Sequence, residues 1–192
     1  MNRLNLVILT FLLFVACRQN NEKKKTSDLI TRDSIEIQQD EEIEPDTKEL
    51  RKEYISEYNN VESLDTTIIE NDGKIIHIHT KYYCLFDNAI TVPGHYVWED
   101  TTKTFKTHNF AQDIKISIDK DTIFKKTITK KYFESKLTPE LKSYAVLMFP
   151  NFSFNKEKGI FDFGYSLTIP ITDVGSGMRL IIDRKGKMTI TD

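Results

Sequence analysis

Apolar and polar residues alternate with a period of two over much of the chain after Leu64, and this pattern restricts the fold more than any other feature. The clearest run, 74–86, places one set of side chains on a shared face, namely Ile76, Ile78, Thr80, Tyr82 and Cys84. Successive side chains of a strand point to opposite faces, so the run predicts a strand with this set in the core. The turn sequence Asn71-Asp72-Gly73 joins it to a shorter strand, 66–70, in a hairpin.

The remaining pattern predicts more strands and two helices. Strands are expected at 114–118, 122–130, 161–172, 178–183 and 187–191, because turn sequences such as Arg184-Lys185-Gly186 separate short alternating runs. Pro170 has no backbone donor and indicates an edge or a bulge in 161–172. Helical spacing predicts a helix at 47–59, capped by Asp46, and another at 139–148 that begins with Thr138 and Pro139. The fold class is therefore α+β: a mainly antiparallel meander with two flanking helices in a single domain.

The chain contains two cysteines, Cys17 and Cys84. Cys84 falls on the apolar face of 74–86, where a buried thiol is expected. A thiol on a core face is unreactive, so Cys84 is not a candidate nucleophile. If Cys17 is modified, no intramolecular disulfide can form, and the fold has to be stable from its hydrophobic core alone.

The first seventeen residues are typical of a bacterial lipoprotein export signal. Met1-Asn2-Arg3 gives a short positive start, an apolar run follows to Ala16, and Cys17 comes directly after it. The run is shorter than the roughly 20 apolar residues that a spanning helix needs. We expect a signal peptide at 1–16 and a lipobox that directs lipidation of Cys17 by acyl chains such as palmitate. Phe14 departs from the usual leucine of this motif, so an ordinary secretory signal or an uncleaved anchor stays open as the alternative.

Residues 17–45 are expected to form a lipidated N-terminus and a disordered acidic tether. The stretch has few apolar residues and ends in the cluster Asp40, Glu41, Glu42 and Glu44, a composition that does not support a packed core. Stable anchoring takes more than one acyl chain, which a lipidated and N-acylated Cys17 supplies. Arg18 stands where an aspartate would resemble an inner-membrane retention signal, so we expect the cell outer membrane and a periplasm-facing position. Residues 46–192 are expected to form the globular domain.

His77 and His79 are the best candidates for a metal site. Because they are two residues apart on a strand, both imidazoles point to the same side and can reach one ion. A third ligand from His95, His108 or a carboxylate is needed, and the sequence does not place one. Both histidines also fall on the polar face of the strand, where exposure to solvent explains them fully.

Other motifs indicate no catalytic site. Gly175-Ser176-Gly177 does not match the nucleophile-elbow pattern, and its glycines are interpreted as turn residues with positive φ. The lysines between Lys115 and Lys142 are consistent with a patch for anionic lipids or glycans. Acidic residues dilute them, so a solvated hairpin that discourages edge pairing is the preferred interpretation. The formal net charge of -2 indicates no affinity for nucleic acid, and no cofactor is expected.

Three short segments stand out together in the globular part. They are Tyr82-Tyr83-Cys84-Leu85 with Asp87-Asn88, then His108-Asn109-Phe110-Ala111, and then Ile169-Pro170-Ile171-Thr172-Asp173-Val174-Gly175. With the lipobox, these segments resemble small lipoproteins of Bacteroidota that carry a domain of unknown function. The resemblance covers 64–191 and implies one domain. It implies no activity, so no catalytic residue carries over.

The leading functional hypothesis is an outer-membrane-anchored, non-enzymatic binding or accessory module with an envelope protein or a glycan as its partner. A lipid anchor and a tether raise the effective concentration of such a module near the membrane. Two alternatives stay open: a metal-assisted envelope enzyme that uses His77 and His79, and an inhibitor or immunity lipoprotein. The sequence does not indicate the oligomeric state.

Overall fold

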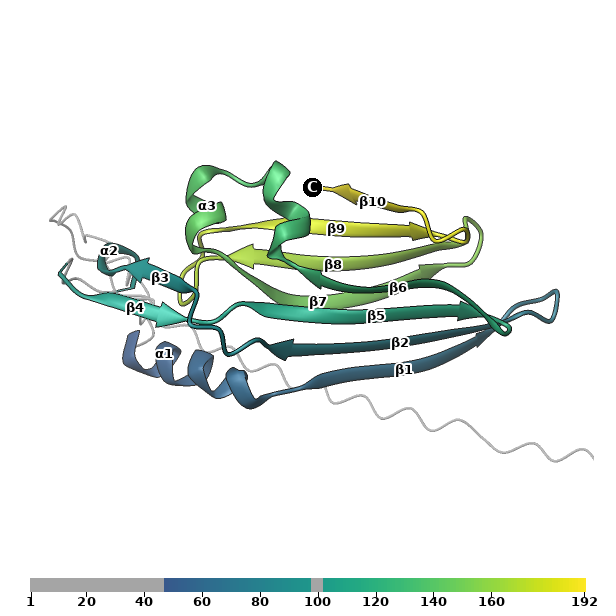
Figure 1. Ribbon diagram of the computed structural model, residues 1–192, viewed down its shortest axis with the longest axis horizontal. Helices are drawn as coiled ribbons and strands as arrows, with labels where there is room; N and C mark the ends of the chain where they lie inside the picture. The colour runs from purple at the N-terminus through teal and green to yellow at the C-terminus, as the bar shows by residue number, and fades with distance from the viewer. Residues whose placement is uncertain (1–46, 98–101) are drawn as a thin grey trace, which may run out of the picture. The chain divides into compact units, whose positions relative to one another are not determined.

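Two antiparallel sheets stacked face to face make up most of the described chain (Figure 1). A computed structural model describes residues 47–97 and 102–192, which lie within the compact unit Ile43–Asp192. The first sheet has the order β1-β2-β5-β6, with β1 at Glu62–Ile69, β2 at Ile75–Cys84, β5 at Phe110–Ile118 and β6 at Asp121–Thr129. The second has the order β10-β9-β8-β7, with β7 at Val146–Asn155, β8 at Ile160–Thr168, β9 at Gly175–Asp183 and β10 at Met188–Thr191. The prediction of a mainly antiparallel fold is confirmed.

The inward faces of the two sheets share one hydrophobic core. In β2 the five residues predicted to face inward are all buried, and the positions between them are exposed or half-buried. β8 supplies the facing set, which is Phe161, Phe163, Tyr165 and Leu167. Burial of this apolar surface is the main force that holds the sheets together, at about 25 cal/mol per Å² removed from water.

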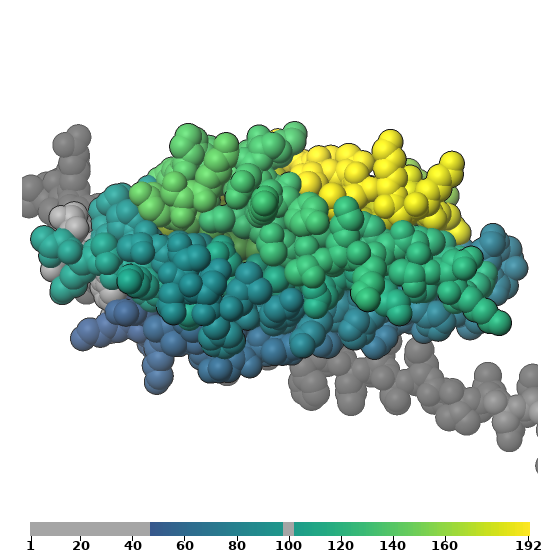
Figure 2. All heavy atoms as spheres, in the orientation of Figure 1, coloured from purple at the N-terminus to yellow at the C-terminus, as the bar shows by residue number. Residues whose placement is uncertain are grey.

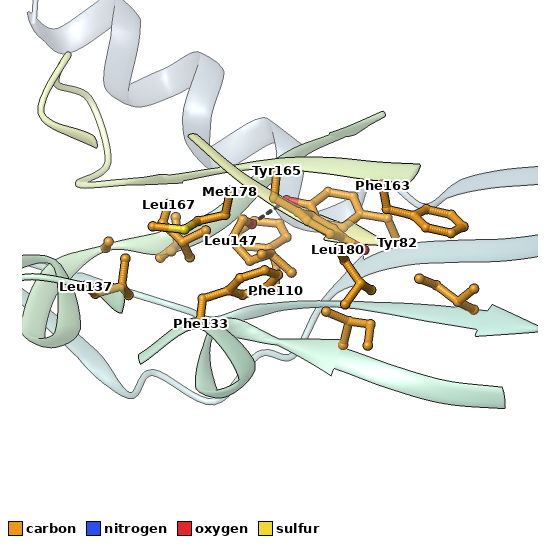
Figure 3. Packing of buried hydrophobic residues seen from close by; sticks show 14 of the residues in the cluster. Tyr82, Phe110, Phe133, Leu137, Leu147, Phe163, Tyr165, Leu167, Met178 and Leu180 are labelled. Carbon is orange, nitrogen blue, oxygen red and sulfur yellow. Dashed lines mark hydrogen bonds between the residues drawn. The ribbon is translucent and has the colours of Figure 1, made fainter. Parts of the chain in front are cut away.

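Two buried hydrogen bonds join the sheets across this core. The Tyr82 hydroxyl donates to the Leu147 carbonyl oxygen at 2.8 Å, the contact marked by the dashed line in Figure 3. The Tyr165 hydroxyl donates to Gln112 Oε1 at 2.5 Å. Buried polar groups are costly without partners, so these bonds favour one alignment of the two sheets.

The β1–β2, β5–β6, β7–β8 and β9–β10 turns lie at one end, and the helical segments lie toward the other, with the β8–β9 connection (Figure 1). α1, at Thr47–Ser56, continues into the 3-10 turn η1 at Glu57–Asn59. Between β2 and β5 the chain forms a small ribbon, with β3 at Ile90–Pro93, α2 at Gly94–Val97 and β4 at Thr104–Thr107. η2, at Lys130–Lys136, and α3, at Pro139–Tyr144, are the green mass beside the yellow C-terminal strands in Figure 2.

The turn glycines explain how the hairpins close. Gly73 has a φ of 84° and donates its N–H to the Glu70 carbonyl oxygen at 3.0 Å, as the turn prediction required. Gly186 has a φ of 75°, and a Cβ added there would lie 2.0 Å from the Ile123 carbonyl oxygen. Only glycine fits this position, where the β9–β10 hairpin touches β6.

The helix expected at 139–148 is wrong at its C-terminal end. Thr138 caps the helix as predicted, since its Oγ1 accepts the Leu141 N–H at 3.2 Å. The helix ends at Tyr144, however, and β7 begins at Val146. The apolar residues of this stretch fit helical spacing, but burial between the sheets and pairing with β8 favour the strand. Pro150 lies inside β7, at the irregularity between Met148 and Asn151, on an edge strand that tolerates a missing donor.

Two further expectations are corrected near β8 and β9. The strand expected at 161–172 ends at Thr168, so Pro170 lies beyond it, and β8 is a central strand rather than an edge. Gly175 and Gly177 lie within β9 and do not have positive φ. A Cβ on Gly175 would lie 2.5 Å from Thr168 Oγ1, so the close approach of β8 explains that glycine.

Candidate functional site

An apolar groove between α1, β7 and the β8–β9 connection is the candidate functional site. Its volume is about 530 Å³, within the range of pockets that hold small molecules or peptide side chains, roughly 300–1,000 Å³. Three walls, each from a different part of the sequence, enclose it. We call it the apolar groove below.

The first wall is one face of α1 and η1. Leu50, Glu53, Tyr54 and Glu57 line the groove, and the spacing i, i+3, i+4, i+7 places them on one side of the helix. Tyr54 is buried, with its ring edge-on to Phe105 at 5.8 Å between centroids. This contact fixes the helix on β4.

A buried hydroxyl strengthens that attachment. Thr107 Oγ1 on β4 lies 2.7 Å from the Tyr54 hydroxyl and 2.9 Å from the Tyr58 hydroxyl. Burial raises the pKa of Tyr54, so this hydroxyl stays neutral and able to hydrogen-bond. The hydrogen bonds of Thr107 to Tyr54 and Tyr58 therefore help to fix the position of the helical wall.

The second wall is the irregular part of β7. Phe149 adopts a φ of 51°, in the left-handed region that bulky residues rarely occupy, and the residue is 69% exposed. Met148, half-buried, precedes it at the groove. Such a conformation costs about 1–3 kcal/mol and is held in place by the structure around it. An exposed aromatic ring on a strained backbone is a feature that packing alone does not explain.

The third wall is the β8–β9 connection, 169–174, which makes up most of the third segment of the resemblance. Ile171 has a φ of 67°, which is unusual for a β-branched residue. Thr172 Oγ1 donates to the Ile169 carbonyl oxygen at 2.8 Å and accepts the Val174 N–H at 3.1 Å. The Ile169 N–H in turn donates to the Val174 carbonyl oxygen at 2.9 Å. These internal bonds hold the loop in one conformation, so the wall is preformed.

The charges around the groove are of one sign. Glu53 and Glu57 stand on the helical side and Asp173 on the loop side, all three exposed. Among the described residues that line the groove, none is basic. Asn60 Nδ2 donates to Glu57 Oε2 at 3.0 Å, which orients one carboxylate but leaves its charge. The groove thus combines an apolar interior with an acidic rim.

A second depression, of about 460 Å³, crosses the outer face of the second sheet. Gly164 and Gly177 leave room there, and Asp162 forms an ion pair with Arg179 beside them. These charged groups already satisfy each other. The depression therefore offers less to a ligand than the apolar groove does.

The two predicted metal ligands lie on the outer face of β2, as the alternation predicted. His77 Nδ1 lies 3.0 Å from Thr67 Oγ1, and His79 Nδ1 lies 2.9 Å from Asp65 Oδ2. Both contacts are cross-strand neighbours in the β1–β2 register. In residues 47–97 and 102–192, no group of three or more His, Cys, Asp or Glu side chains could hold a metal ion. A metal at His77 and His79 stays a prediction.

The structure does not bring the other two histidines to His77 and His79. His95 lies on α2, against the Tyr96 ring at 4.2 Å. His108 precedes Phe110, which pairs with Cys84, and Cys84 is roughly 17 Å along β2 from His79 at 3.4 Å per residue. The Nδ1 atom of His108 accepts the Asn88 N–H at 2.9 Å instead.

That contact belongs to a junction between the first two segments of the resemblance. Asp87 accepts hydrogen bonds from the Asn109 side chain at 2.8 Å and from its backbone N–H at 3.0 Å. Desolvation by itself would raise the pKa of Asp87, but these two hydrogen bonds and a third from the Ala89 N–H lower it below its usual value. The polar residues of these segments thus bond to each other, which is a structural role.

Cys84 is buried and free, as predicted, and burial raises the pKa of its thiol. The lysines between Lys115 and Lys142, for which a solvated hairpin was preferred to a ligand-binding patch, lie in separate places. Lys115 and Lys125 are opposite each other in the β5–β6 register, whereas Lys126 lies over two aromatic rings. Lys130 Nζ donates to the Lys142 carbonyl oxygen at 2.9 Å, and burial lowers its pKa.

The predicted lipidation site Cys17, the signal peptide at 1–16, the tether at 17–45 and the cap Asp46 lie outside the described residues. Within the described part of the chain, no helix is both long and apolar enough to cross a membrane. A scan against protein-family models finds no match, and a search of the curated proteins finds none either. Function is therefore inferred from the site itself.

The groove was not predicted from the sequence, although two signals point to it. Helical spacing at 47–59 predicts an apolar stripe that contains Leu50 and Tyr54, and this stripe is expected to dock on the domain or on a partner. Phe149-Pro150 placed an aromatic residue before a proline at the end of an apolar run. Neither signal shows that the β8–β9 connection completes the site.

Proposed function

We propose that this chain is a non-enzymatic binding module of the cell envelope, held at the outer membrane by lipid on Cys17 and carrying one globular domain, 46–192, on a flexible tether. The observation that supports binding most is the apolar groove, with its preformed walls and its exposed Phe149. Exposed apolar surface beside strained backbone is more typical of an interaction site than of a protein surface that contacts only water.

The lipid anchor is proposed from the sequence at 1–17. Attachment to a membrane is consistent with a binding module. Two or more acyl chains hold a protein at a bilayer stably. A tethered domain then meets other envelope components at a raised effective concentration, so modest affinity is enough for function.

Separate experiments test the two halves of the proposal. For the anchor, mass spectrometry of the native protein should find a diacylglyceryl group and an acyl group on Cys17, and C17S should release the protein from membranes. An unmodified Cys17 in membrane-bound protein would contradict the anchor.

For binding, a matched pair of helix variants is available. Leu50→Ser changes the groove, whereas Ile55→Ser changes an apolar side chain of the same helix that is 40% exposed and does not line the groove. The expected result is that a partner captured from solubilised membranes is lost with L50S and kept with I55S. Equal capture by both variants would contradict a role for the groove, and turnover of the partner would contradict a non-enzymatic function.

A further inference from the structure

We infer that the apolar groove takes a basic polypeptide segment, in which one or two apolar side chains are flanked by lysine or arginine. The inference rests on the proposed binding function and adds the chemistry of the partner. It follows from the combination of an apolar interior with carboxylates on two of the walls.

Charge complementarity selects the occupant. Glu53 and Glu57 border the groove on the helical side and Asp173 on the loop side, with no basic residue among the described lining. A segment with cations on both sides of its apolar anchor can pair with carboxylates of both the helical wall and the loop wall. Anionic amphiphiles, such as fatty acids and acidic phospholipids, would place like charges together and are disfavoured.

Phe149 also favours a cationic ligand. Its exposed ring stands at the groove beside the acidic rim. A lysine or arginine near the face of an aromatic ring is attracted to it, at about 0.5–1 kcal/mol for an exposed site. An apolar anchor inside the groove and a cation over Phe149 can therefore belong to one short segment.

The walls leave few other polar groups for recognition. The Thr172 hydroxyl is already used within its own loop by Ile169 and Val174. The Tyr54 hydroxyl is turned toward Thr107 in the core. Neutral hydrogen-bonding ligands such as glycans would find little to bind, whereas the carboxylates remain accessible.

The test uses residues 17–192 with C17S, in buffer without detergent, and three fluorescent peptides. The first has a leucine and a tryptophan flanked by lysines, the second has glutamates in place of the lysines, and the third keeps the lysines but replaces the apolar pair by glycine and serine. Fluorescence anisotropy should show binding of the first peptide only. Binding should weaken with added salt, because exposed charges are screened over about 8 Å at physiological ionic strength.

Charge-neutral variants then locate the site. Glu53→Gln with Glu57→Gln should weaken binding of the first peptide by roughly two- to fivefold per carboxylate, the range for exposed ion pairs. Glu49→Gln, on the same helix but outside the groove, should leave the affinity unchanged. Equal affinity for the acidic peptide, or equal weakening by E49Q, would overturn the inference.

Failure of the inference can be told apart from failure of the proposed function. If a fatty acid, an anionic vesicle or the acidic peptide binds and L50S abolishes it, the groove is a binding site but its partner chemistry is wrong. If sedimentation shows a dimer that L50S disrupts, a second copy of the chain is the occupant, and the inference is again wrong. If no probe responds to L50S but a membrane partner is still lost with L50S and kept with I55S, only the partner chemistry is wrong, whereas equal capture by both variants refutes the role of the groove and the inference with it.

Discussion

Replacing Thr107 by valine should loosen α1 and with it the helical wall of the groove. Thr107 is fully buried, and its hydroxyl is the partner of both Tyr54 and Tyr58. Valine keeps the volume of the side chain but removes this hydroxyl. The Tyr54 hydroxyl is then left in the core without that partner, whereas the half-buried Tyr58 can turn to water.

Tyr54→Phe and Thr107→Val should lower the free energy of unfolding by different amounts, because only Thr107→Val leaves a buried hydroxyl without a partner. Tyr54→Phe loses one hydrogen bond, at about 1 kcal/mol, and Thr107 keeps Tyr58 as a partner. Thr107→Val leaves a buried hydroxyl unsatisfied, at about 1–3 kcal/mol. The double variant removes that hydroxyl too, so it should be more stable than T107V alone, which requires a coupling free energy larger than the roughly 1 kcal/mol that Y54F costs.

Urea unfolding followed by circular dichroism measures these free energies, and amide hydrogen exchange shows where stability is lost. In T107V the exchange of residues 50–56 should accelerate more than that of β8. If the double variant loses as much stability as the sum of the single variants, Tyr54 and Thr107 do not interact. The attachment of α1 would then need another explanation.

Three further predictions follow from single features of the structure. Burial raises the pKa of Tyr54, Tyr82 and Tyr165 above that of a free tyrosine, about 10, so these hydroxyls ionise in the unfolded chain before they ionise in the folded one. The free energy of unfolding should therefore fall as pH rises above about 10. Urea midpoints measured across that range check this, and Tyr165→Phe, which removes one of these groups, should lessen the slope. Gly186→Ala should destabilise the fold by about 1–3 kcal/mol, because its φ is positive and the added Cβ would collide with the Ile123 carbonyl oxygen. Gly177→Ala, whose Cβ would meet nothing within 4 Å, should change stability by less than about 0.5 kcal/mol. Thermal melts of the two variants measure the difference. Cys84 should react with a maleimide far more slowly than a free thiol until denaturant opens the core, and fast labelling of the native chain with C17S would contradict its burial.

Local sequence patterns predicted the strands well where one face of the strand is buried and the other is exposed to solvent. The alternation at Ile76, Ile78 and Thr80 identified both the strand β2 and its core face, because the period of two is a direct consequence of strand geometry. The turns at Gly73 and Gly186 were also found, since positive φ restricts the residue there.

The errors occurred where tertiary contacts decide between two local possibilities. The stretch that begins at Val146 fits a helix or a buried strand equally well from its apolar residues, and pairing with β8 determines the outcome. The groove joins Leu50 to Ile171, which are far apart in the sequence, so no local pattern could place them together. The left-handed conformations of Phe149 and Ile171 contradict local preference, so the local sequence could not predict them.

The most direct test of a groove that binds a basic segment is photo-crosslinking in intact cells, with benzoylphenylalanine in place of Phe149 and, as the control, in place of the exposed Thr122 on β6. A groove that binds a basic segment predicts a cross-link from position 149 to a polypeptide segment rich in lysine or arginine around an apolar residue, and a weaker cross-link when Glu53→Gln and Glu57→Gln are added. The same cross-links from both positions, or cross-links from position 149 to lipid, would contradict it.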